Sequence, residues 1–480
     1  MPKRLPLILS IDCGSTNLKA GLFDEGLHRL AEDSLPVIYS VRDAERVEFD
    51  AEKMWHTTVA LIRHVCAMAG IQPVEITRIA LTSQAQTFTI LDAAGSPLMP
   101  FLSWADKRAV TESAELAEQL GAEFHLHCSF PAPSPQLQLL KVLWVQHHHP
   151  EWFSLDSRMV SLPEFVALRL AGIQAIDRNL ASMSGLYSLQ RGDWWSDAVR
   201  SCGLRNEQLP LLVDTGASRR AKKPCDDIVF SPKLEIVFAG NDQTAGAFGN
   251  ACHSDKMIVT LGTALVVYRY AGDEPGPYSP GGCWGPYPGG GFYELATRDE
   301  GCAALDWARS QLMPEDDMET FMGYAESSSF SGGDAFSHSL YKGETEGNAE
   351  GERIFFYPER MGTEGAWVGK GDLAARVHSV LEGISFTLRR LIVEELQAGA
   401  RPSSICVIGG GSNSRFWLQL LADILNCPVR RGEGDTLLGA AMMAIPEAVP
   451  PAHSTSDVLK PDPSRAALYE DLYRNWLANL

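Results

Sequence analysis

The sequence predicts an α/β protein built from two similar domains. Its 480 residues, 45% of them hydrophobic, can bury more than one domain core. A strand, a turn with small polar residues and a second strand are indicated at 8–24 and again at 257–270, about half the chain later. Between these segments the patterns of helices and strands alternate. Two ordinary β-hairpins also explain the two segments, because a single pair of short matches is weak evidence for duplication.

The first of these segments places a carboxylate between two buried strands. Apolar runs at 7–11 and 18–23 favour strands, since runs of this length bounded by glycine are typical of a sheet. Asp12 and the polar turn 14–16 lie between them. The sheet itself has no need of a carboxylate at this point.

The chain between the two hairpins gives further helix and strand signals. Asp50 can cap a helix with Met54, Leu61, Val65 and Met68 on one face, and Gly70 can end it. The segment 79–98 predicts a strand, the polar turn Ser-Gln-Ala-Gln and a second strand, so that this turn also faces a cleft. The charged segment 214–235 is loop-like and suits a domain junction.

A glycine-rich segment at 405–429 predicts a strand, three glycines and an amphipathic helix. Gly409 to Gly411 let a ligand approach the main chain, and Ser412 or Ser414 can cap the helix, whose N-terminus favours electronegative groups. The pattern suits a nucleotide. It is neither a dinucleotide fingerprint nor a Walker A loop, because the required spacing of glycines is absent here and around 365–371.

Asp242, in the segment 237–251, is a candidate general base. It follows an apolar strand and precedes Gln243 and small residues that suit the start of a helix. An aspartate at this place is also explained by simple N-capping of that helix.

Composition and charge exclude several classes of function. The net charge of −19 and the absence of a Lys/Arg-rich run argue against a nucleic-acid partner. No segment approaches the roughly eighteen apolar residues of a membrane span, and the N-terminus does not fit a signal peptide. Ten cysteines without a C-x-x-C pair suit reduced thiols in the cytoplasm and predict no zinc site. The histidines at 147–149 are expected at the solvated end of a helix.

Five motifs occur in order along the chain: DCGSTNLK at 12–19, LSWADKR at 102–108, AGNDQTAGAFG at 239–249, LGT at 261–263 and GGGSNSRF at 409–416. Their order resembles the FGGY carbohydrate kinases, which belong to the actin, chaperone and hexokinase-like ATPase superfamily. The resemblance runs from Leu7 to about Met443 and implies two actin-like, ribonuclease-H-like ATPase domains with a cleft between them. We expect an N-terminal domain at 1–240, a C-terminal domain at 241–446 and an extension at 447–480, with a surface excursion at 326–352.

The resemblance implies that ATP and Mg²⁺ are the cofactors. The residues expected to bind them are Asp12, Gly14, Ser15, Thr16, Lys19, Gly262, Thr263, Gly301, Gly410, Gly411 and Ser414. A turn of this kind offers N–H groups, hydroxyls and a cation to phosphate oxygens. Asp12 and Asp242 would serve Mg²⁺, and Asp242 would take the proton from the attacking hydroxyl. Cys302 stands where many relatives have a second glycine, which predicts an altered adenine pocket.

The acceptor side is where the chain departs from its relatives. The expected substrate residues are Gln84, Gln86, Trp104, Asp106, Arg108 and Gln243. Xylulokinases carry Gln-Met-His-Gly, and glycerol kinases Arg-Glu, where this chain has Gln84-Ala-Gln-Thr87. The W-x-D-x-R pattern suits a polyhydroxylated ligand through stacking and paired hydrogen bonds, although Trp104 could instead be a core residue. Gln243 after the base is similar to the Asp-Gln of glycerol kinases.

The resemblance predicts ATP-dependent phosphorylation of a sugar hydroxyl, with a ketopentose such as xylulose as the first choice. The alternatives are a kinase of a small polyol, a deoxy-ketose or an aldonate, a non-sugar ATPase of the actin or chaperone type, and a kinase homologue that has lost activity. The expected partner is a small-molecule sugar or polyol, without nucleic acid or membrane. We expect a cytoplasmic protein, and a homodimer is one possible assembly.

Overall fold

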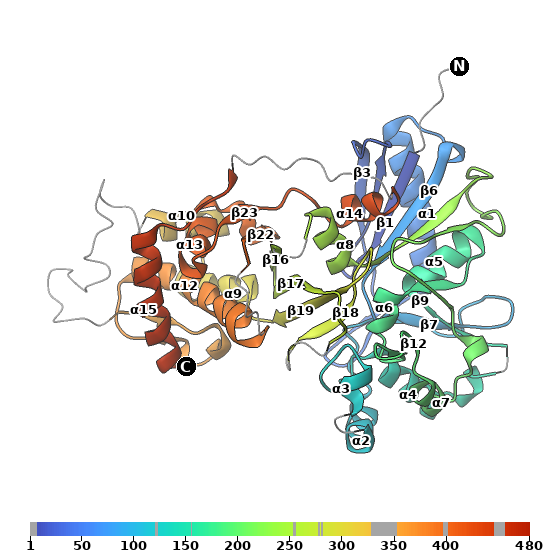
Figure 1. Cartoon of the computed structure of the whole chain (residues 1–480), viewed down its shortest axis with the longest axis horizontal. Helices are drawn as coiled ribbons and strands as arrows, with labels where there is room; N and C mark the ends of the chain where they lie inside the picture. The colour runs from blue at the N-terminus through green and yellow to red at the C-terminus, as the bar shows by residue number, and fades with distance from the viewer. Residues whose placement is uncertain are drawn as a thin grey trace. The chain divides into compact units, whose positions relative to one another are not determined.

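The computed structural model describes residues 7–120, 123–154, 156–252, 256–276, 279, 282–327, 353–396, 402–445 and 457–480. The chain divides into two compact units, seen in Figure 1. The first comprises Met1–Cys252, Tyr270–Glu294 and Gly434–Ala452, and the second His253–Arg269, Leu295–Glu433 and His453–Leu480. Both contain helices and sheets, which confirms the α/β class. The expected domain boundaries stay a prediction, and the excursion expected at 326–352 lies outside the described residues from 328 onward.

The first unit is organised around a sheet with the order β14-β15-β6-β1-β2-β3. Its strands are β1 (Leu7–Cys13), β2 (Asn17–Phe23), β3 (Arg29–Pro36), β6 (Ile76–Ser83), β14 (Ser218–Arg220) and β15 (Glu235–Asn241). β1, β6 and β15 run parallel, and the register pairs Ser83 with Cys13 on one side and Asn241 on the other. The carboxyl ends of three strands therefore meet at one edge, where Asp12 and Asp242 lie.

The first hairpin is longer than its apolar residues predict. β1 continues to Cys13 and β2 begins at Asn17, so Asp12 lies within a strand and the turn is confined to 14–16. The antiparallel register places Asp12 opposite Lys19. The segment 214–235, expected at a domain junction, lies inside the first unit and supplies β14.

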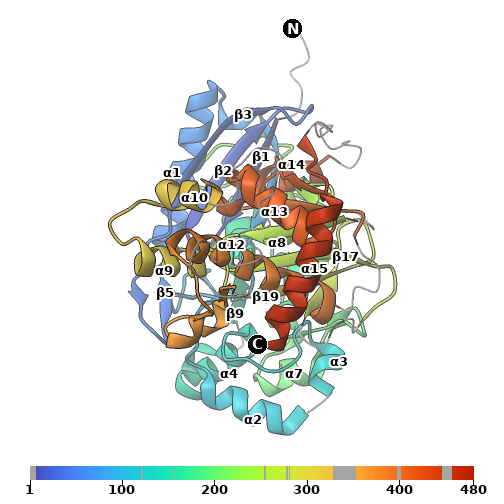
Figure 2. The same cartoon turned by 90° about the vertical axis from the view of Figure 1, so that its left-hand side faces the viewer.

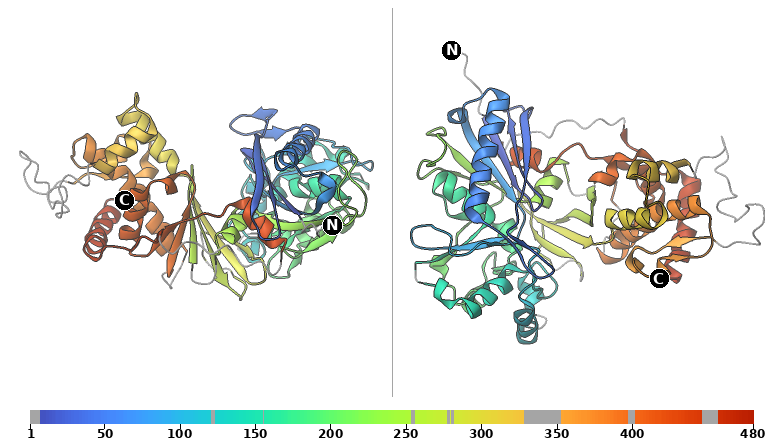
Figure 3. Two further views of the ribbon diagram at one scale, coloured as in Figure 1. Left: turned by 90° about the horizontal axis from the view of Figure 1, so that it is seen from above. Right: turned by 180° about the vertical axis from the view of Figure 1, so that it is seen from behind.

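Helix α1 (Ala51–Ala69) has the predicted ends. Asp50 accepts a hydrogen bond from the Lys53 N–H, and Gly70 ends the helix in the left-handed conformation, with φ 66°. Most of the expected apolar face is buried, but Met68 in the last turn is 56% exposed, contrary to the prediction. The right-hand view of Figure 3 shows α1 running across the sheet that contains β2 and β3, and it packs against both strands.

Two helices distant in sequence pack together beside this sheet. α8 (Asp242–Gly249) follows β15 directly, and α14 (Thr436–Met443) packs against α8 and β1, as Figure 1 shows. A Cβ atom added to Gly439 would lie 1.8 Å from the Ala245 carbonyl oxygen. The helices therefore approach through glycine, and the chain returns near its C-terminal end to complete the first unit.

A second sheet of the first unit carries the segments that contain the predicted substrate residues. This five-stranded sheet has the order β4-β5-β8-β7-β9, with β4 (Val41–Arg42), β5 (Val47–Phe49), β8 (Phe101–Leu102), β7 (Phe88–Leu91) and β9 (Arg158–Ser161). The nearby helices are α2 (Val110–Leu120), α3 (Glu123–His127) and α4 (Gln138–His148). The unit also contains α5 (Leu162–Ala171), β10 (Ala175–Asp177), α6 (Arg178–Ser182), β11 (Tyr187–Ser188), β12 (Asp193–Trp194), α7 (Ser196–Ser201), β13 (Leu211–Val213) and β18 (Cys283–Pro286).

In the second unit the strands β17, β16, β22 and β23 are neighbours in that order within a sheet. The elements wholly within it are β16 (Lys256–Leu261), α9 (Cys302–Leu312), α10 (Met318–Ser327), β20 (Phe355–Phe356), β21 (Trp367–Val368), α12 (Leu373–Arg390), β22 (Ser404–Ile408), α13 (Arg415–Leu425), β23 (Val429–Arg431) and α15 (Pro463–Ala478). Two further strands, β17 (Leu265–Gly272) and β19 (Phe292–Arg298), belong to it only in part, because the unit boundary falls within each of them. Figure 2 shows α15 close to α13, against which it packs.

The two sheets repeat one pattern. β1 and β2 form an antiparallel hairpin with β6 parallel to β1, and β16 and β17 form a hairpin with β22 parallel to β16. Two unrelated hairpins do not account for this shared third strand. Among the helices of the described residues, none has the length and apolar character that a membrane span requires.

Candidate active site

Asp242 is the first residue of α8, and the helix cap is its neighbour Asn241. The Asn241 side chain accepts a hydrogen bond from the Thr244 N–H at 2.8 Å. The explanation of Asp242 as a simple N-cap is therefore wrong. Its Oδ1 accepts from the Gln243 N–H at 2.8 Å, and burial, with a smaller contribution from the Asp12 carboxylate, raises the pKa of Asp242 to about 7.

Asp12 lies at the end of β1 and is 2% exposed. Its Oδ2 accepts a hydrogen bond from the Thr436 hydroxyl at 2.7 Å and lies 3.7 Å from Lys19 Nζ. Burial raises the pKa of Asp12 above its usual range, against the lowering effect of Lys19. Its Oδ1 is buried and makes no hydrogen bond within the described part of the chain. Sequence reasoning missed Thr436, which no local motif connects to Asp12.

The turn 14–16 is held by its carbonyl groups. The Gly14 carbonyl accepts from Gln84 Nε2 at 3.2 Å, and the Ser15 carbonyl accepts from the Tyr39 hydroxyl at 2.6 Å. The Thr16 carbonyl accepts a hydrogen bond from the Val37 N–H at 2.9 Å. A Cβ atom at Gly14 would lie 2.8 Å from the carbonyl oxygen of residue 17, which explains the glycine. The turn is fixed while the Thr16 side chain stays exposed.

Gln84 and Gln86 present buried amide oxygens. The Oε1 atoms of both side chains are buried and without a hydrogen-bond partner in the described residues. Gln86 has φ 62°, a left-handed conformation that is uncommon for a residue with a side chain. Buried oxygens of this kind are suited to accept hydrogen bonds from ligand hydroxyls.

The three residues of the W-x-D-x-R pattern differ in solvent exposure and in the hydrogen bonds that they already make. Trp104 is 41% exposed, so its interpretation as a core residue is wrong. Asp106 is fully buried, and its two oxygens accept hydrogen bonds from Arg108 and from the Val47 N–H. Arg108 also bonds Glu48. Direct contact of Asp106 and Arg108 with a substrate stays a prediction, and their present contacts are internal to the unit.

In the second unit the predicted nucleotide residues lie at three chain reversals. The Gly262 carbonyl accepts a hydrogen bond from the Cys302 N–H at 2.7 Å. The Thr263 carbonyl accepts one from the N–H of Ala303 at 3.1 Å. A Cβ atom on Gly301 would lie 2.6 Å from the Gly262 oxygen. Gly301 therefore has a packing reason to be glycine, and its contact with a cofactor stays a prediction.

The third glycine-rich segment has the predicted capped helix. Ser414 is the N-cap of α13 and accepts from the Trp417 N–H at 3.1 Å, whereas Ser412 bonds the Gly409 carbonyl instead. A Cβ atom on Gly411 would lie 2.8 Å from the Leu261 side chain, but one on Gly410 would meet nothing within 4 Å. Gly410 therefore offers an open main-chain surface.

Within the described ranges, no group of three or more His, Cys, Asp or Glu side chains is arranged to hold a metal ion.

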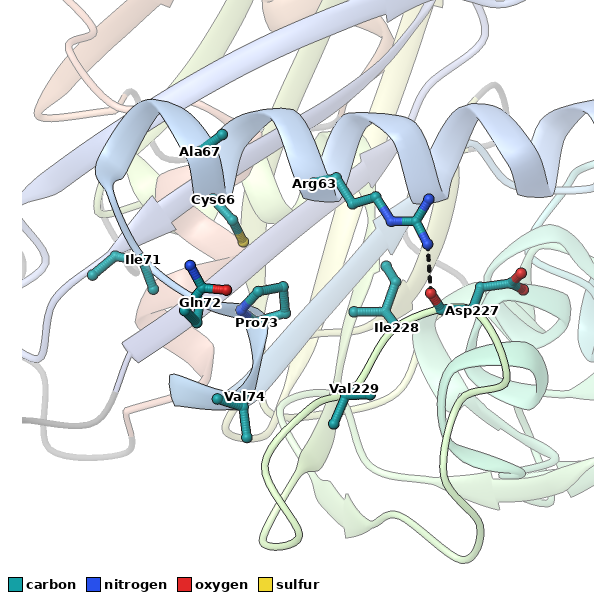
Figure 4. A pocket seen from close by; sticks show the side chains of 10 residues that line it. All are labelled: Arg63, Cys66, Ala67, Ile71, Gln72, Pro73, Val74, Asp227, Ile228 and Val229. Carbon is teal, nitrogen blue, oxygen red and sulfur yellow. Dashed lines mark hydrogen bonds between the residues drawn. The ribbon is translucent and has the colours of Figure 1, made fainter.

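A hollow of about 540 Å³, shown in Figure 4, lies between α1, the segment 71–74 and the segment 227–229. Arg63 on its wall donates to the Asp227 carbonyl oxygen. None of the predicted site residues lines this hollow.

Comparison with known proteins decides the family. The N-terminal domain model of the FGGY family of carbohydrate kinases matches residues 7–249, and the C-terminal domain model matches residues 257–447. The chain belongs to the FGGY carbohydrate kinases. This confirms the resemblance found in the motifs.

The relatives of this FGGY kinase act on different acceptors. The chain is 23% identical to a xylulose kinase from Bacillus subtilis over 91% of its own length and 87% of that protein. It is also 23% identical to a gluconokinase from Bacillus subtilis, over 91% of its length and 87% of that protein. The solved xylulose kinase from Rhodospirillum rubrum matches 98% of both chains with a TM-score of 0.84 at 19% identity, which confirms the two-domain fold.

Membership of the FGGY family makes the protein a sugar kinase that uses ATP. The alternative of a non-sugar ATPase of the actin or chaperone type is thereby set aside. The individual site residues, Mg²⁺ and the identity of the acceptor belong to the proposal that follows.

Proposed function

We propose that this FGGY kinase transfers the γ-phosphoryl group of ATP to a hydroxyl of a ketopentose such as xylulose, with Asp242 as the general base. The environment of Asp242 carries the proposal. Its carboxylate is fixed at the start of α8, and its pKa is raised to about 7. A base that titrates near the operating pH can accept a proton as the hydroxyl attacks, which is the requirement of general-base catalysis.

The roles of the first unit follow from the hydrogen bonds already made. Asp242 Oδ1 accepts from the Gln243 N–H, so Oδ2 is the oxygen that takes the proton from the acceptor hydroxyl. The turn 14–16 offers N–H groups and hydroxyls to the phosphoryl oxygens, and Lys19 adds a positive charge near Asp12. Phosphoryl transfer depends on positioning and charge stabilisation, and a fixed turn provides both.

The first unit also has a carboxylate that fits Mg²⁺. Asp12 Oδ1 is buried and unpartnered within the described residues, and the Asp12 charge raises the pKa of Asp242. A divalent cation held by Asp12 and Asp242 would relieve this repulsion. When bound, Mg²⁺ supplies charge neutralisation for the phosphate oxygens.

The acceptor chemistry is supported by three side chains. The exposed Trp104 ring offers an apolar wall, and the unpartnered oxygens of Gln84 and Gln86 can each accept a hydrogen bond from a sugar hydroxyl. The choice of a ketopentose as acceptor rests on the xylulose kinases among the relatives. A small polyol, a deoxy-ketose or an aldonate is the alternative, and the gluconokinase relative supports the aldonate.

An acceptor screen tests the proposal. Purified protein with Mg·ATP is offered ketopentoses, deoxy-ketoses, polyols and aldonates, and ADP formation is measured together with the mass of the phosphorylated product. We expect the highest kcat/KM with a ketopentose. A higher kcat/KM with gluconate would select the aldonate alternative, and ADP formation that no acceptor stimulates would contradict the proposal.

A further inference from the structure

Lys141 is a buried lysine whose contacts are with the acceptor-side segments. It lies on α4 and is fully buried. Lysine is almost never fully buried unless its charge is compensated, because removing an ammonium group from water is unfavourable. Its Nζ donates hydrogen bonds to the Gln86 carbonyl oxygen at 3.0 Å and to the Ser103 carbonyl oxygen at 2.6 Å.

These two carbonyls belong to different segments of the chain. Gln86 lies in the segment 84–87 after β6, and Ser103 begins the segment 103–108 after β8. The Thr87 hydroxyl accepts from the Trp104 N–H at 3.0 Å and joins the same segments a second time. We call 84–87 and 103–108 the two acceptor loops. Lys141 is therefore a clamp between them.

The clamp acts on the conformation of Gln86. The left-handed main chain of Gln86, with φ 62°, is unfavourable for a residue with a Cβ atom. Such a conformation persists when its surroundings fix it, and Lys141 holds the carbonyl group of this residue. The direction of the unpartnered Gln86 Oε1 therefore depends on the ammonium group.

Charges on the second acceptor loop act on Lys141. The pKa of Lys141 is lowered to about 7, because burial and, to a smaller extent, Arg108 lower it against the raising effect of Asp106. Asp106 is hydrogen-bonded to Arg108, which also bonds Glu48 on β5. The negative charge of Asp106 therefore compensates the charge of Arg108 as well as that of Lys141. The ammonium form makes the stronger hydrogen bonds to the two carbonyls, because charge-assisted bonds exceed neutral ones.

We propose that Lys141 is a positioning residue that sets the spacing of the two acceptor loops and thereby the affinity for the acceptor. This inference rests on the proposed function, since it assigns acceptor binding to these loops. As the pH rises through about 7 the ammonium group loses its proton, the clamp weakens and the KM for the acceptor rises.

The test compares Lys141→Met, which keeps the length of the side chain without donors, with Lys141→Gln, which keeps an amide donor. Lys53→Met is the matched control, because Lys53 is an exposed lysine of helix α1, outside both acceptor loops. Acceptor KM, ATP KM and kcat are measured from pH 6 to pH 8 with the best acceptor of the screen. Acceptor binding is followed separately by calorimetry.

We expect Lys141→Met to raise the acceptor KM at least tenfold, to leave the ATP KM within twofold and to remove the pH dependence of the acceptor KM. Lys141→Gln should lie between it and the wild type, and Lys53→Met should match the wild type. An unchanged acceptor KM and pH profile in Lys141→Met would overturn the inference. Equal changes in both KM values would also overturn it, because they indicate a general loss of structure.

The wild-type profile is a test that needs no variant. A wild-type acceptor KM that is constant from pH 6 to pH 8 would overturn the inference even if Lys141→Met failed to fold. If no acceptor of the panel binds or is phosphorylated, both the inference and the proposed function fail. If an acceptor is phosphorylated and Lys141→Met binds it normally, the inference alone fails.

Discussion

The side chain of Asn179 binds both the main chain and the side chain of Asn241, the residue before Asp242. Its Oδ1 accepts from the Asn241 N–H at 2.9 Å and from Asn241 Nδ2 at 2.7 Å. Its Nδ2 donates to the Thr244 hydroxyl at 3.0 Å and to the Pro286 carbonyl oxygen at 2.8 Å. All four hydrogen-bonding positions of the amide are therefore used. This buried amide fixes the junction between β15 and α8, from which the Asp242 carboxylate projects.

Replacing Asn179 should impair catalysis through the position of Asp242. Asn179→Ala removes the acceptor of the buried Asn241 N–H, and an unsatisfied buried group of this kind costs about 1–3 kcal/mol of folding free energy. We expect a lower melting temperature and a kcat reduced roughly tenfold, with the ATP KM unchanged because the turn 14–16 is untouched. Steady-state kinetics and thermal unfolding measure both effects. A kcat equal to that of the wild type in a folded variant would show that Asp242 does not depend on Asn179.

Removing the carboxylate of Asp242 should abolish most of the activity. Asp242→Asn keeps the shape of the side chain but cannot accept the proton, so kcat should fall by about 10²–10⁴-fold, the usual contribution of a general base. In the wild type kcat should rise as the pH increases through about 7, since the base must be deprotonated. The variant should lack this rise. Turnover near the wild-type rate would remove Asp242 from the role.

The same substitution should stabilise the protein at alkaline pH. The pKa of Asp242 is about 7 when folded, against an ordinary value of 3.8, so the folded state holds the proton more tightly than the unfolded state. The contribution of this proton to stability is fully present below about pH 4 and is lost as the pH rises to 7. Asparagine does not ionise, so the melting temperature of Asp242→Asn relative to the wild type should increase between pH 5 and pH 8. A constant difference would contradict the raised pKa.

The sequence predicted the residues that belong to local motifs and missed those that support them from elsewhere. The hairpin at 8–24, the capped α1 and the Ser414 cap of α13 follow from spacing and capping rules that act within a few residues. Thr436 reaches Asp12 across more than four hundred residues, and no pattern within the sequence connects them. The sequence pattern singled out Asp242, whose role stays a prediction, but the residue that caps its helix depended on one residue of register.

Burial also separates residues that the motif groups together. W-x-D-x-R suggested three ligand-facing side chains, whereas Trp104 is exposed and Asp106 is fully enclosed by its own neighbours. Sequence spacing gives the order of side chains but not which of them satisfy one another. Lys141 went unnoticed for the same reason, since a lysine in a helix is ordinarily a solvated residue.

Thr436 offers a test of the Asp12 environment. Thr436→Val removes the hydroxyl that donates to Asp12 Oδ2 and preserves the shape, while Thr436→Ser keeps the hydroxyl as a matched control. Loss of this bond makes the charged carboxylate less favourable and should raise its pKa further. We expect a higher Mg²⁺ concentration for half-maximal activity in the valine variant, and wild-type behaviour in the serine variant. Identical Mg²⁺ titrations for all three proteins would contradict a role of Asp12 at the metal.

The contact between α8 and α14 should not tolerate a methyl group. In Gly439→Ala the new Cβ would lie 1.8 Å from the Ala245 carbonyl oxygen, so the helices must move apart at a cost of about 1–3 kcal/mol or more. Gly246→Ala on α8 is the control, because its Cβ would meet only the Thr436 methyl group at 3.8 Å. The control should be neutral or stabilising, since alanine favours a helix over glycine. Denaturant unfolding that ranks the two variants equally would contradict the close packing of these helices.

Gln86 and Asp106 should respond differently to substitution, although both are expected from the sequence to contact the substrate. Gln86→Ala removes an amide whose oxygen has no partner in the described residues, so stability should be nearly unchanged while the acceptor KM rises severalfold and the preference among acceptors changes. Asp106→Asn weakens the buried contacts with Arg108 and the Val47 N–H, so the melting temperature should fall together with acceptor affinity. Kinetics over the acceptor panel and thermal unfolding separate the two cases. If Asp106→Asn changes acceptor preference at an unchanged melting temperature, Asp106 contacts the acceptor directly. If Gln86→Ala keeps the wild-type ranking of acceptors and kcat/KM, the acceptor site does not include the 84–87 loop.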